Sequence, residues 1–173
     1  LTFKKVKRIV LMGGAGFEPG NITPAAEFNI YVDPHAAKSL FQSDIEIFMF
    51  GLDVTHQMII TPSRLEAIKN CSEIVGPAVA DLLTFFNSYD TKKYGWEGAP
   101  LHDPCTIAWL IKPDIFKMKK MSVEVETNSG PAYGRTVADW FNVTNKTKNI
   151  NVATNGNTDE FFKLLNKRLK LFS

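Results

Sequence analysis

The chain has 173 residues, of which 45% are hydrophobic and 22% are charged, and its formal net charge is +2. Such a composition excludes a disordered protein, and the length fits one domain spanning residues 1–173. No basic stripe is interleaved with aromatic residues, so nucleic-acid binding is not expected, and no apolar run approaches the ~18 residues that a membrane span requires.

Apolar runs and turn residues predict strands alternating with helices along the chain. Strands are expected at residues 7–11, 45–51 and 150–154, and a β-hairpin at residues 122–126 and 134–141. Helices are expected at residues 33–42, 61–70, 72–88, 103–111 and 157–171, and residues 90–100 are expected to form a loop. Asp33 and Thr61 are expected to be N-caps, because each is followed by proline. This alternation predicts an α/β fold.

Two cysteines and two of the three histidines are expected to have structural roles. Cys71 and Cys105 fit neither a zinc pattern nor a disulfide framework, and both lie in apolar surroundings. They are predicted to be core thiols, which is consistent with a reducing, cytoplasmic location. His35 and His56 belong to no chemical motif.

Residues 20–34, with the sequence GNITPAAEFNIYVDP, mix polar and apolar side chains. Buried polar groups cost roughly 1–3 kcal/mol each unless they are paired. A segment that places Asn21, Glu27 and Asn29 among apolar neighbours is therefore a candidate wall of a polar pocket. The simpler alternative, a loop that leads into a helix capped by Asp33, remains open for these residues.

Several motifs in fixed order resemble the nucleoside hydrolase family, the inosine-uridine preferring ribonucleoside hydrolases, which cleave the N-glycosidic bond of ribonucleosides. They are MGG at residues 12–14, GNITPAAEFN at 20–29, LDVT at 52–55 and PLHDP at 100–104. The resemblance runs from about residue 7 to the C-terminal helix. It implies a three-layer α/β fold, in which helices cover both faces of an open, mainly parallel sheet that also carries the hairpin.

The resemblance also implies which residues bind ribose. The positions of Asn21 and Glu27 would face the 5′ end of the sugar, and Asn29 its 2′ and 3′ hydroxyls. Carboxamides both donate and accept hydrogen bonds, as sugar hydroxyls do. Phe28 and Met12 would form an apolar floor beneath the ring, although Met12 could equally be a core methionine at a strand end.

The PLHDP motif would supply the remaining site residues. By resemblance, His102 is the catalytic residue that acts on the leaving base, and an imidazole that titrates near neutral pH can donate a proton. Asp103 would bind calcium and lie near the ribose hydroxyls, but an aspartate before Pro104 is also typical of a helix N-cap. Tyr94 and Trp96 precede the motif and could contact the base.

One part of the family pattern is missing. Family members begin with an Asp-rich stretch of the type DxDPGxDD, which supplies most calcium ligands and the base that activates water, and no such stretch occurs before Met12. A later segment whose backbone carbonyl reaches the calcium ion is also absent. The chain is therefore expected to be the C-terminal half of a nucleoside hydrolase, truncated at its N-terminus, with an incomplete calcium site.

Three interpretations follow. The first is a ribonucleoside hydrolase of nucleoside salvage whose isolated half is inactive. The second is a non-catalytic fragment that binds ribose or a partner chain, and the third is an unrelated sugar-binding module, against which the HDP and EFN motifs argue. An unpaired sheet edge would favour a homo-oligomer, such as a homotetramer. Purine or pyrimidine preference does not follow from the sequence.

Overall fold

The structure, a computed structural model, describes residues 5–172, except for the side chains of Tyr89, Asp90 and Lys93. The chain divides into two compact units. The first unit comprises Leu1–Thr55 and Phe116–Asn155, and the second comprises His56–Ile115 and Gly156–Ser173. The expectation of a single domain over residues 1–173 stays a prediction.

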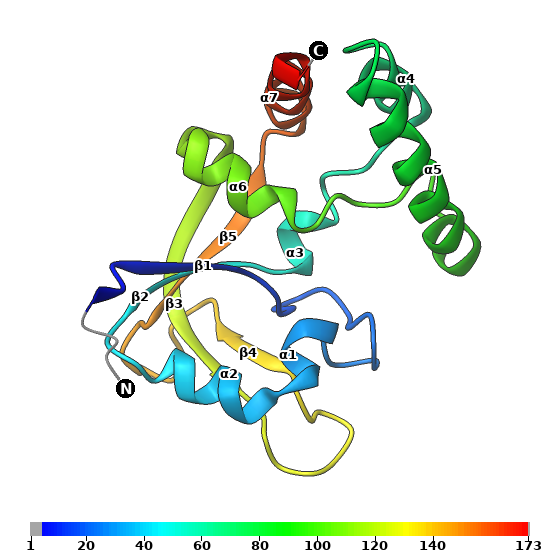
Figure 1. Ribbon diagram of the computed structural model, residues 1–173. Coiled ribbons are helices and arrows are strands. Elements are labelled where there is room, and N and C mark those ends of the chain that lie inside the picture. Colours follow the sequence, from blue (N-terminus) through cyan, green and yellow to red (C-terminus); the bar gives the residue numbers. More distant parts are fainter. Residues whose placement is uncertain (1–4, 173) are drawn as a thin grey trace. The chain divides into compact units, whose positions relative to one another are not determined.

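A five-stranded open sheet forms the first unit (Figure 1). Its order is β1-β2-β5-β3-β4, with bounds Arg8–Met12, Glu46–Phe50, Ile150–Gly156, Phe116–Val125 and Thr136–Asp139. Strands β1, β2 and β5 are parallel neighbours, whereas β3 and β4 form an antiparallel hairpin. The predicted α/β class, with a mixed open sheet and a hairpin, is confirmed. The three-layer arrangement with helices on both faces stays a prediction.

The core of this unit explains why these residues form strands. Ile47 and Met49 alternate along β2 and are almost fully buried, as are Ile150 on β5 and Met121 on β3. Burying side chains of this size contributes about 1.5–3 kcal/mol each. Phe41, at the end of helix α2 (Pro34–Phe41), belongs to the same cluster.

Capping residues set the start of α2 as predicted. The Asp33 Oδ1 atom accepts a hydrogen bond from the Ala36 amide at 2.9 Å, and Pro34 occupies the first helical turn. Two one-turn helices were not expected, namely α1 (Phe28–Val32) and α3 (Leu52–Thr55). Both are too short for helical periodicity to appear in the sequence.

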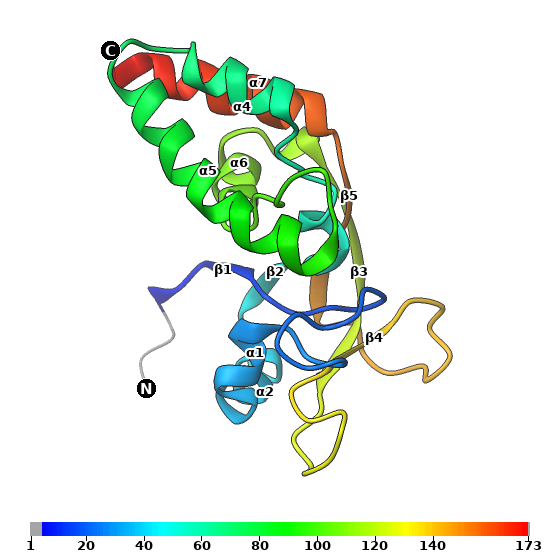
Figure 2. The same cartoon turned by 90° about the vertical axis from the view of Figure 1, so that its right-hand side faces the viewer.

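Helices dominate the second unit (Figure 2). They are α4 (Pro62–Lys69), α5 (Val75–Tyr94), α6 (Pro104–Ile111) and α7 (Thr158–Leu169), with single 3₁₀ turns at Pro113–Ile115 and Lys170–Phe172. The expected loop at residues 90–100 is wrong in its first half, because α5 continues to Tyr94 and stops at Gly95, where φ is +68°. Within residues 5–172, no helix is long and apolar enough to cross a lipid bilayer.

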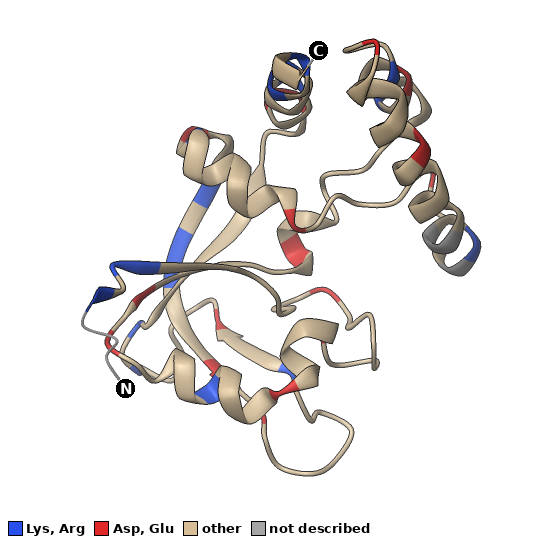
Figure 3. Cartoon of the chain, viewed as in Figure 1, with Lys and Arg blue, Asp and Glu red and all other residues tan. Residues whose placement is uncertain are grey.

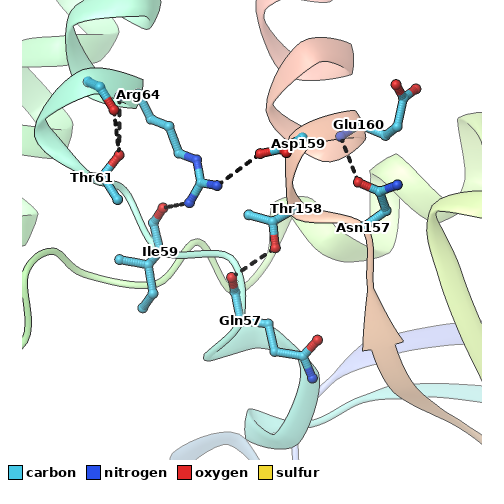
Figure 4. A network of polar contacts seen from close by, with 9 residues as sticks. Gln57, Ile59, Thr61, Arg64, Asn157, Thr158, Asp159 and Glu160 are labelled. Atoms are coloured by element: carbon cyan, nitrogen blue, oxygen red, sulfur yellow. Dashed lines mark hydrogen bonds and ion pairs between the residues drawn. The ribbon is translucent and has the colours of Figure 1, made fainter.

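A polar network joins α4 to the start of α7 (Figure 4). The Arg64 guanidinium donates to the Ile59 carbonyl at 2.8 Å and to Asp159 Oδ1 at 3.1 Å. The Thr158 hydroxyl donates to the Gln57 carbonyl at 3.1 Å. These contacts fix the first turn of α7 against the segment that leads into α4.

Basic and acidic residues are spread over the elements of both units (Figure 3). On α7, Lys163, Lys167 and Arg168 are exposed, as expected for a solvated helix face. Both cysteines are buried and unpaired, which confirms that they are core thiols. Burial, assisted by the nearby Asp103 charge, raises the pKa of Cys105 to about 12, so this thiol is not a nucleophile at neutral pH.

Candidate functional site

Glu27 organises the segment that the sequence predicts to bind ribose. Its side chain is only 2% exposed. Its Oε2 atom accepts from the amides of Gly14 at 2.8 Å and Ile30 at 3.2 Å, and its Oε1 atom accepts from the Asn29 amide at 2.8 Å. Glu27 is thus the N-cap of α1 and ties this helix to the loop after β1. A direct contact between Glu27 and ribose stays a prediction.

The two asparagines of the segment are also held in place. Asn21 Oδ1 accepts from the Phe28 amide at 2.8 Å. The exposed Asn29 donates through Nδ2 to the carbonyl oxygen of Met12, 3.3 Å away, and lies 3.3 Å from the Met12 sulfur. Phe28 is 51% exposed. The structure therefore brings together five of the six predicted ribose-binding residues, all except Asp103, and their ligand stays a prediction.

Five consecutive backbone amides, at residues 14–18, each donate to a side chain. Gly14 donates to Glu27, and Ala15 donates to Thr136 Oγ1 at 2.8 Å. The next three, at residues 16–18, all donate to the carboxylate of Asp53, at 2.7, 2.7 and 2.9 Å. Because side chains hold all five amides, the backbone of this loop is restricted even without a ligand.

Arg135 and Thr136 were missed as parts of this site, whereas Asp53 follows a predicted strand at the same sheet edge as Met12, which predicts one shared pocket. The Arg135 guanidinium donates to the Gly16 carbonyl at 3.1 Å, and the Thr136 hydroxyl donates to the Ala15 carbonyl at 3.0 Å. The LDVT motif at the carboxyl end of β2 was the available signal for Asp53. No local signal pointed to Arg135 or Thr136, because they lie more than a hundred residues further along the chain.

Gly14 is required at the tightest point of the loop. Its φ angle is +85°, and a Cβ atom there would lie 2.9 Å from Thr136 Oγ1. Its carbonyl accepts from the Leu52 amide at 2.8 Å. Only glycine combines this backbone conformation with such a close approach.

In the second unit, His102 lies at the end of a row of four rings. Its ring centroid is 5.8 Å from that of His56, which is 4.8 Å from Trp96. Trp96 in turn stacks on Tyr94 at 4.7 Å, with an angle of 22° between the planes. No sequence motif linked His56 to His102, and His56 was expected to have only a structural role.

The environment changes the acid–base chemistry of His102. Burial, and secondarily the charge of His56, lowers the pKa of His102 to about 4. The expectation that this imidazole titrates near neutral pH is therefore wrong. At neutral pH the ring is uncharged, and it can offer an N–H hydrogen bond to a ligand but not a stored proton.

Asp103 does not act as the expected N-cap. It is exposed and its side chain makes no capping hydrogen bond to α6, although its carbonyl accepts from the Thr106 amide at 3.1 Å and from the Thr106 hydroxyl at 2.8 Å. Calcium takes about 6–8 oxygen ligands. Within residues 5–172, no group of three or more His, Cys, Asp or Glu side chains could hold a metal ion. The expected calcium ion, with Asp103 as one ligand, stays a prediction.

The predicted residues divide between the two units. Met12 and the segment at residues 20–29 belong to the first, whereas His102 and Asp103 belong to the second. Their convergence on one pocket stays a prediction.

Comparison with known proteins supports the resemblance to nucleoside hydrolases. The family described as inosine-uridine preferring nucleoside hydrolase matches residues 2–163. The pyrimidine-specific ribonucleoside hydrolase RihA of Klebsiella pneumoniae is 46% identical over 170 residues, which are 98% of this chain and 54% of that protein. An uncharacterized protein of Schizosaccharomyces pombe is 45% identical over 168 residues, covering 97% of this chain and 54% of its own length.

Solved structures show the same similarity. The purine-preferring ribonucleoside hydrolase from Gardnerella vaginalis superposes with a TM-score of 0.82 at 31% identity, over 97% of this chain and 55% of its own. The inosine-uridine preferring nucleoside hydrolase from Bacillus anthracis has a TM-score of 0.78 at 27% identity, over 96% of this chain and 52% of its own. The chain spans about half the length of the curated relatives that it matches.

Proposed function

Since the chain belongs to the inosine-uridine preferring nucleoside hydrolase family, we propose that the protein containing it hydrolyses the N-glycosidic bond of ribonucleosides to ribose and free base. The observation that carries this proposal is the rigid polar segment after β1. Asn21 lies in this segment and Asn29 in helix α1 at its end, both close in sequence to the loop at residues 14–18 whose amides are held by side chains. Ligands of open α/β sheets bind outside the carboxyl ends of the strands, where this loop begins.

The chain would contribute binding and orientation to the reaction. Asn29, with Asn21 nearby, would bond the ribose hydroxyls, and Met12 and Phe28 would provide apolar surface beneath the sugar ring. His102, neutral at neutral pH, would donate a hydrogen bond to the leaving base, which stabilises charge that develops there as the glycosidic bond breaks. These roles require the ribose-binding residues and His102 to line the same pocket in the whole protein.

Calcium remains a proposal for the whole protein, in which Asp103 would be one of several oxygen ligands. Asp103 is exposed and its side chain makes no capping bond, so its carboxylate is compatible with such a role. The steps assigned to this chain do not depend on the metal. A homo-oligomer and a cytoplasmic location are likewise proposals, the latter resting on two unpaired, buried cysteines.

For substrate preference, we favour pyrimidine ribonucleosides. The support is the 46% identity to RihA of Klebsiella pneumoniae, named as pyrimidine-specific, against 31% to the purine-preferring enzyme of Gardnerella vaginalis. A second candidate function is a non-catalytic module that binds ribose or a partner chain. It is favoured by the lack of a metal-binding group within residues 5–172.

The test uses the full-length gene product, assayed for ribose release from uridine, cytidine and inosine. Asn29→Ala should reduce kcat/KM about 10- to 100-fold, because a sugar-positioning group is lost. The exposed Asn70, at the end of α4 and outside the motifs at residues 12–29 and 100–104, provides the matched control Asn70→Ala, which should leave activity unchanged. Ribose binding without release from any of the three substrates would favour the non-catalytic candidate.

A further inference from the structure

We propose that Asp53 is a positioning residue of the ribose site, which acts through the loop at residues 14–18 without touching the sugar. This inference rests on the proposed function and deepens it. It gives a role to a carboxylate that the sequence marked only as part of the LDVT motif.

Asp53 holds three successive amides in a geometry that a chance contact would not give. Its Oδ2 atom accepts from Gly16 at 2.7 Å, and its Oδ1 atom accepts from Phe17 at 2.7 Å and Glu18 at 2.9 Å. Distances this short are typical of charge-assisted hydrogen bonds, which are roughly twice as strong as neutral ones. Three amides that converge on one carboxylate leave the backbone at residues 16–18 little freedom.

The carboxylate is itself fixed on a rigid element. Asp53 lies in the first turn of α3, which directly follows β2 at the carboxyl end of the parallel strands. The Leu52 amide beside it donates to the Gly14 carbonyl at 2.8 Å, and the Thr55 amide donates to the Gly51 carbonyl at 3.1 Å. The sheet therefore sets the position of Asp53, and Asp53 sets the position of the loop.

A continuous chain of hydrogen bonds leads from this loop to the ribose residues. Gly14, two residues before the first amide that Asp53 holds, donates to Glu27 at 2.8 Å. Glu27 accepts from the Asn29 amide at 2.8 Å, and the Asn29 side chain reaches the Met12 carbonyl at 3.3 Å. A shift of the loop therefore moves Glu27, and with it the carboxamide of Asn29.

A role as metal ligand fits Asp53 less well. Both of its oxygens already accept from backbone amides, so a cation would compete with the bonds that hold the loop. Among the described residues, no further His, Cys, Asp or Glu side chains join it in a metal-binding group. Positioning is the role that uses its three bonds to the loop amides.

The experiment compares Asp53→Ala and Asp53→Asn in the full-length gene product, with Asp44→Asn as the matched control. Asp44 is an exposed acidic residue of the same unit, outside the loop and the ribose segment. We expect Asp53→Ala to lower kcat/KM for uridine about 10- to 100-fold, mainly through kcat, because ribose is misplaced rather than merely bound less tightly. Asp53→Asn should lie in between, since its amide oxygen can still accept, and Asp44→Asn should equal the wild type.

Amide hydrogen exchange gives an independent readout. In both Asp53 variants, exchange should become faster at residues 14–18 and across residues 20–29, while β3 keeps its protection. Where Asp53→Ala does not fold, Asp53→Asn carries the same test. A purely structural role would lower Tm and leave kcat of the folded enzyme unchanged, which would overturn the inference.

The outcomes separate the two proposals. A wild-type protein that releases no ribose overturns the proposed function, and the ribose role of Asp53 with it. An active wild type whose Asp53 variants match Asp44→Asn in kcat overturns only the positioning role. Unchanged exchange at residues 20–29 in Asp53→Asn also overturns the positioning role, whatever the activity.

Discussion

At the residue scale, burial gives the His102 imidazole a pKa different from that of an ordinary histidine. Its pKa falls from 6.5 to about 4 in the folded protein, first through burial and then through His56. Between these values the unfolded chain binds more protons than the folded one, so the free energy of unfolding rises with pH from about 4 to 6.5. The stabilisation is complete above pH 6.5 and is lost as the pH falls toward 4.

We predict that His102→Gln reduces this pH dependence, by on the order of 1–3 kcal/mol between the two limits. Urea unfolding at a series of pH values measures it. The exposed His35 provides the control variant His35→Gln, which is measured in the same way. An NMR titration midpoint of His102 near its ordinary 6.5 would contradict the account.

Gly14 gives a second prediction at this scale. Gly14 and Gly95 both have positive φ, +85° and +68°, but only at Gly14 would a Cβ atom meet a neighbour, Thr136 Oγ1 at 2.9 Å. Gly95→Ala should therefore cost only the conformational penalty of about 1–2 kcal/mol. Gly14→Ala should cost clearly more, because the loop must also move away from Thr136. Thermal unfolding of the two variants measures the difference in stability. An equal loss of stability in both would contradict the prediction, because it would mean that the loop accommodates the added methyl group without cost.

At the scale of elements, the sequence predicted those whose patterns are long enough to read. Strands β1, β2 and β5 appeared as apolar runs, and α2 and α4 through aspartate or threonine followed by proline. The first half of β3 was missed, because Lys117, Lys119 and Lys120 interrupt its apolar pattern. Helix α1 has only five residues, which is too short for helical periodicity to appear. Its N-cap is the buried Glu27, a residue type that does not by itself indicate a helix start.

The network between α4 and α7 yields a prediction for an element. Arg64 donates to the Ile59 carbonyl at 2.8 Å and lies over the Phe162 ring at 4.7 Å, with its side chain 26% exposed. Arg64→Met should therefore destabilise the protein by about 1–3 kcal/mol through the lost charged hydrogen bond and ring contact. Chemical denaturation measures the change.

Two controls show which contact of Arg64 matters. Lys69→Met removes an exposed charge from the last turn of the same helix. Asp159→Asn removes the ion-pair partner, whose side chain is 92% exposed. Neither should have a resolvable effect, because exposed ion pairs contribute little. A loss in Asp159→Asn as large as that in Arg64→Met would assign the stabilisation to the ion pair instead.

At the scale of the whole molecule, the sequence identified the polar residues of the candidate site but not what holds them. Asn21, Asn29 and Met12 came from motifs, and the structure connects them. The supporting groups Asp53 and Arg135 come from distant segments, and only the folded sheet brings them to the loop. The LDVT motif after a predicted strand was a signal for Asp53, whereas nothing in the sequence pairs Arg135 with the loop.

The open sheet gives a prediction about association. Within the described residues, β1 is an edge strand that carries the apolar run Ile9, Val10 and Leu11. Exposed apolar edges favour pairing between chains, so the purified 173-residue chain should self-associate as its concentration rises. Light scattering measures this, and a clean monomer at high concentration would contradict it.

We propose that this chain supplies ribose and base contacts but not a complete metal site. The most direct measurement is ribose release from uridine and inosine by the purified 173-residue chain, with added calcium and with a chelator, beside the full-length gene product. We expect no ribose release by the 173-residue chain under either condition, and ribose release by the full-length gene product. Robust, calcium-dependent release by the 173-residue chain alone would contradict the account.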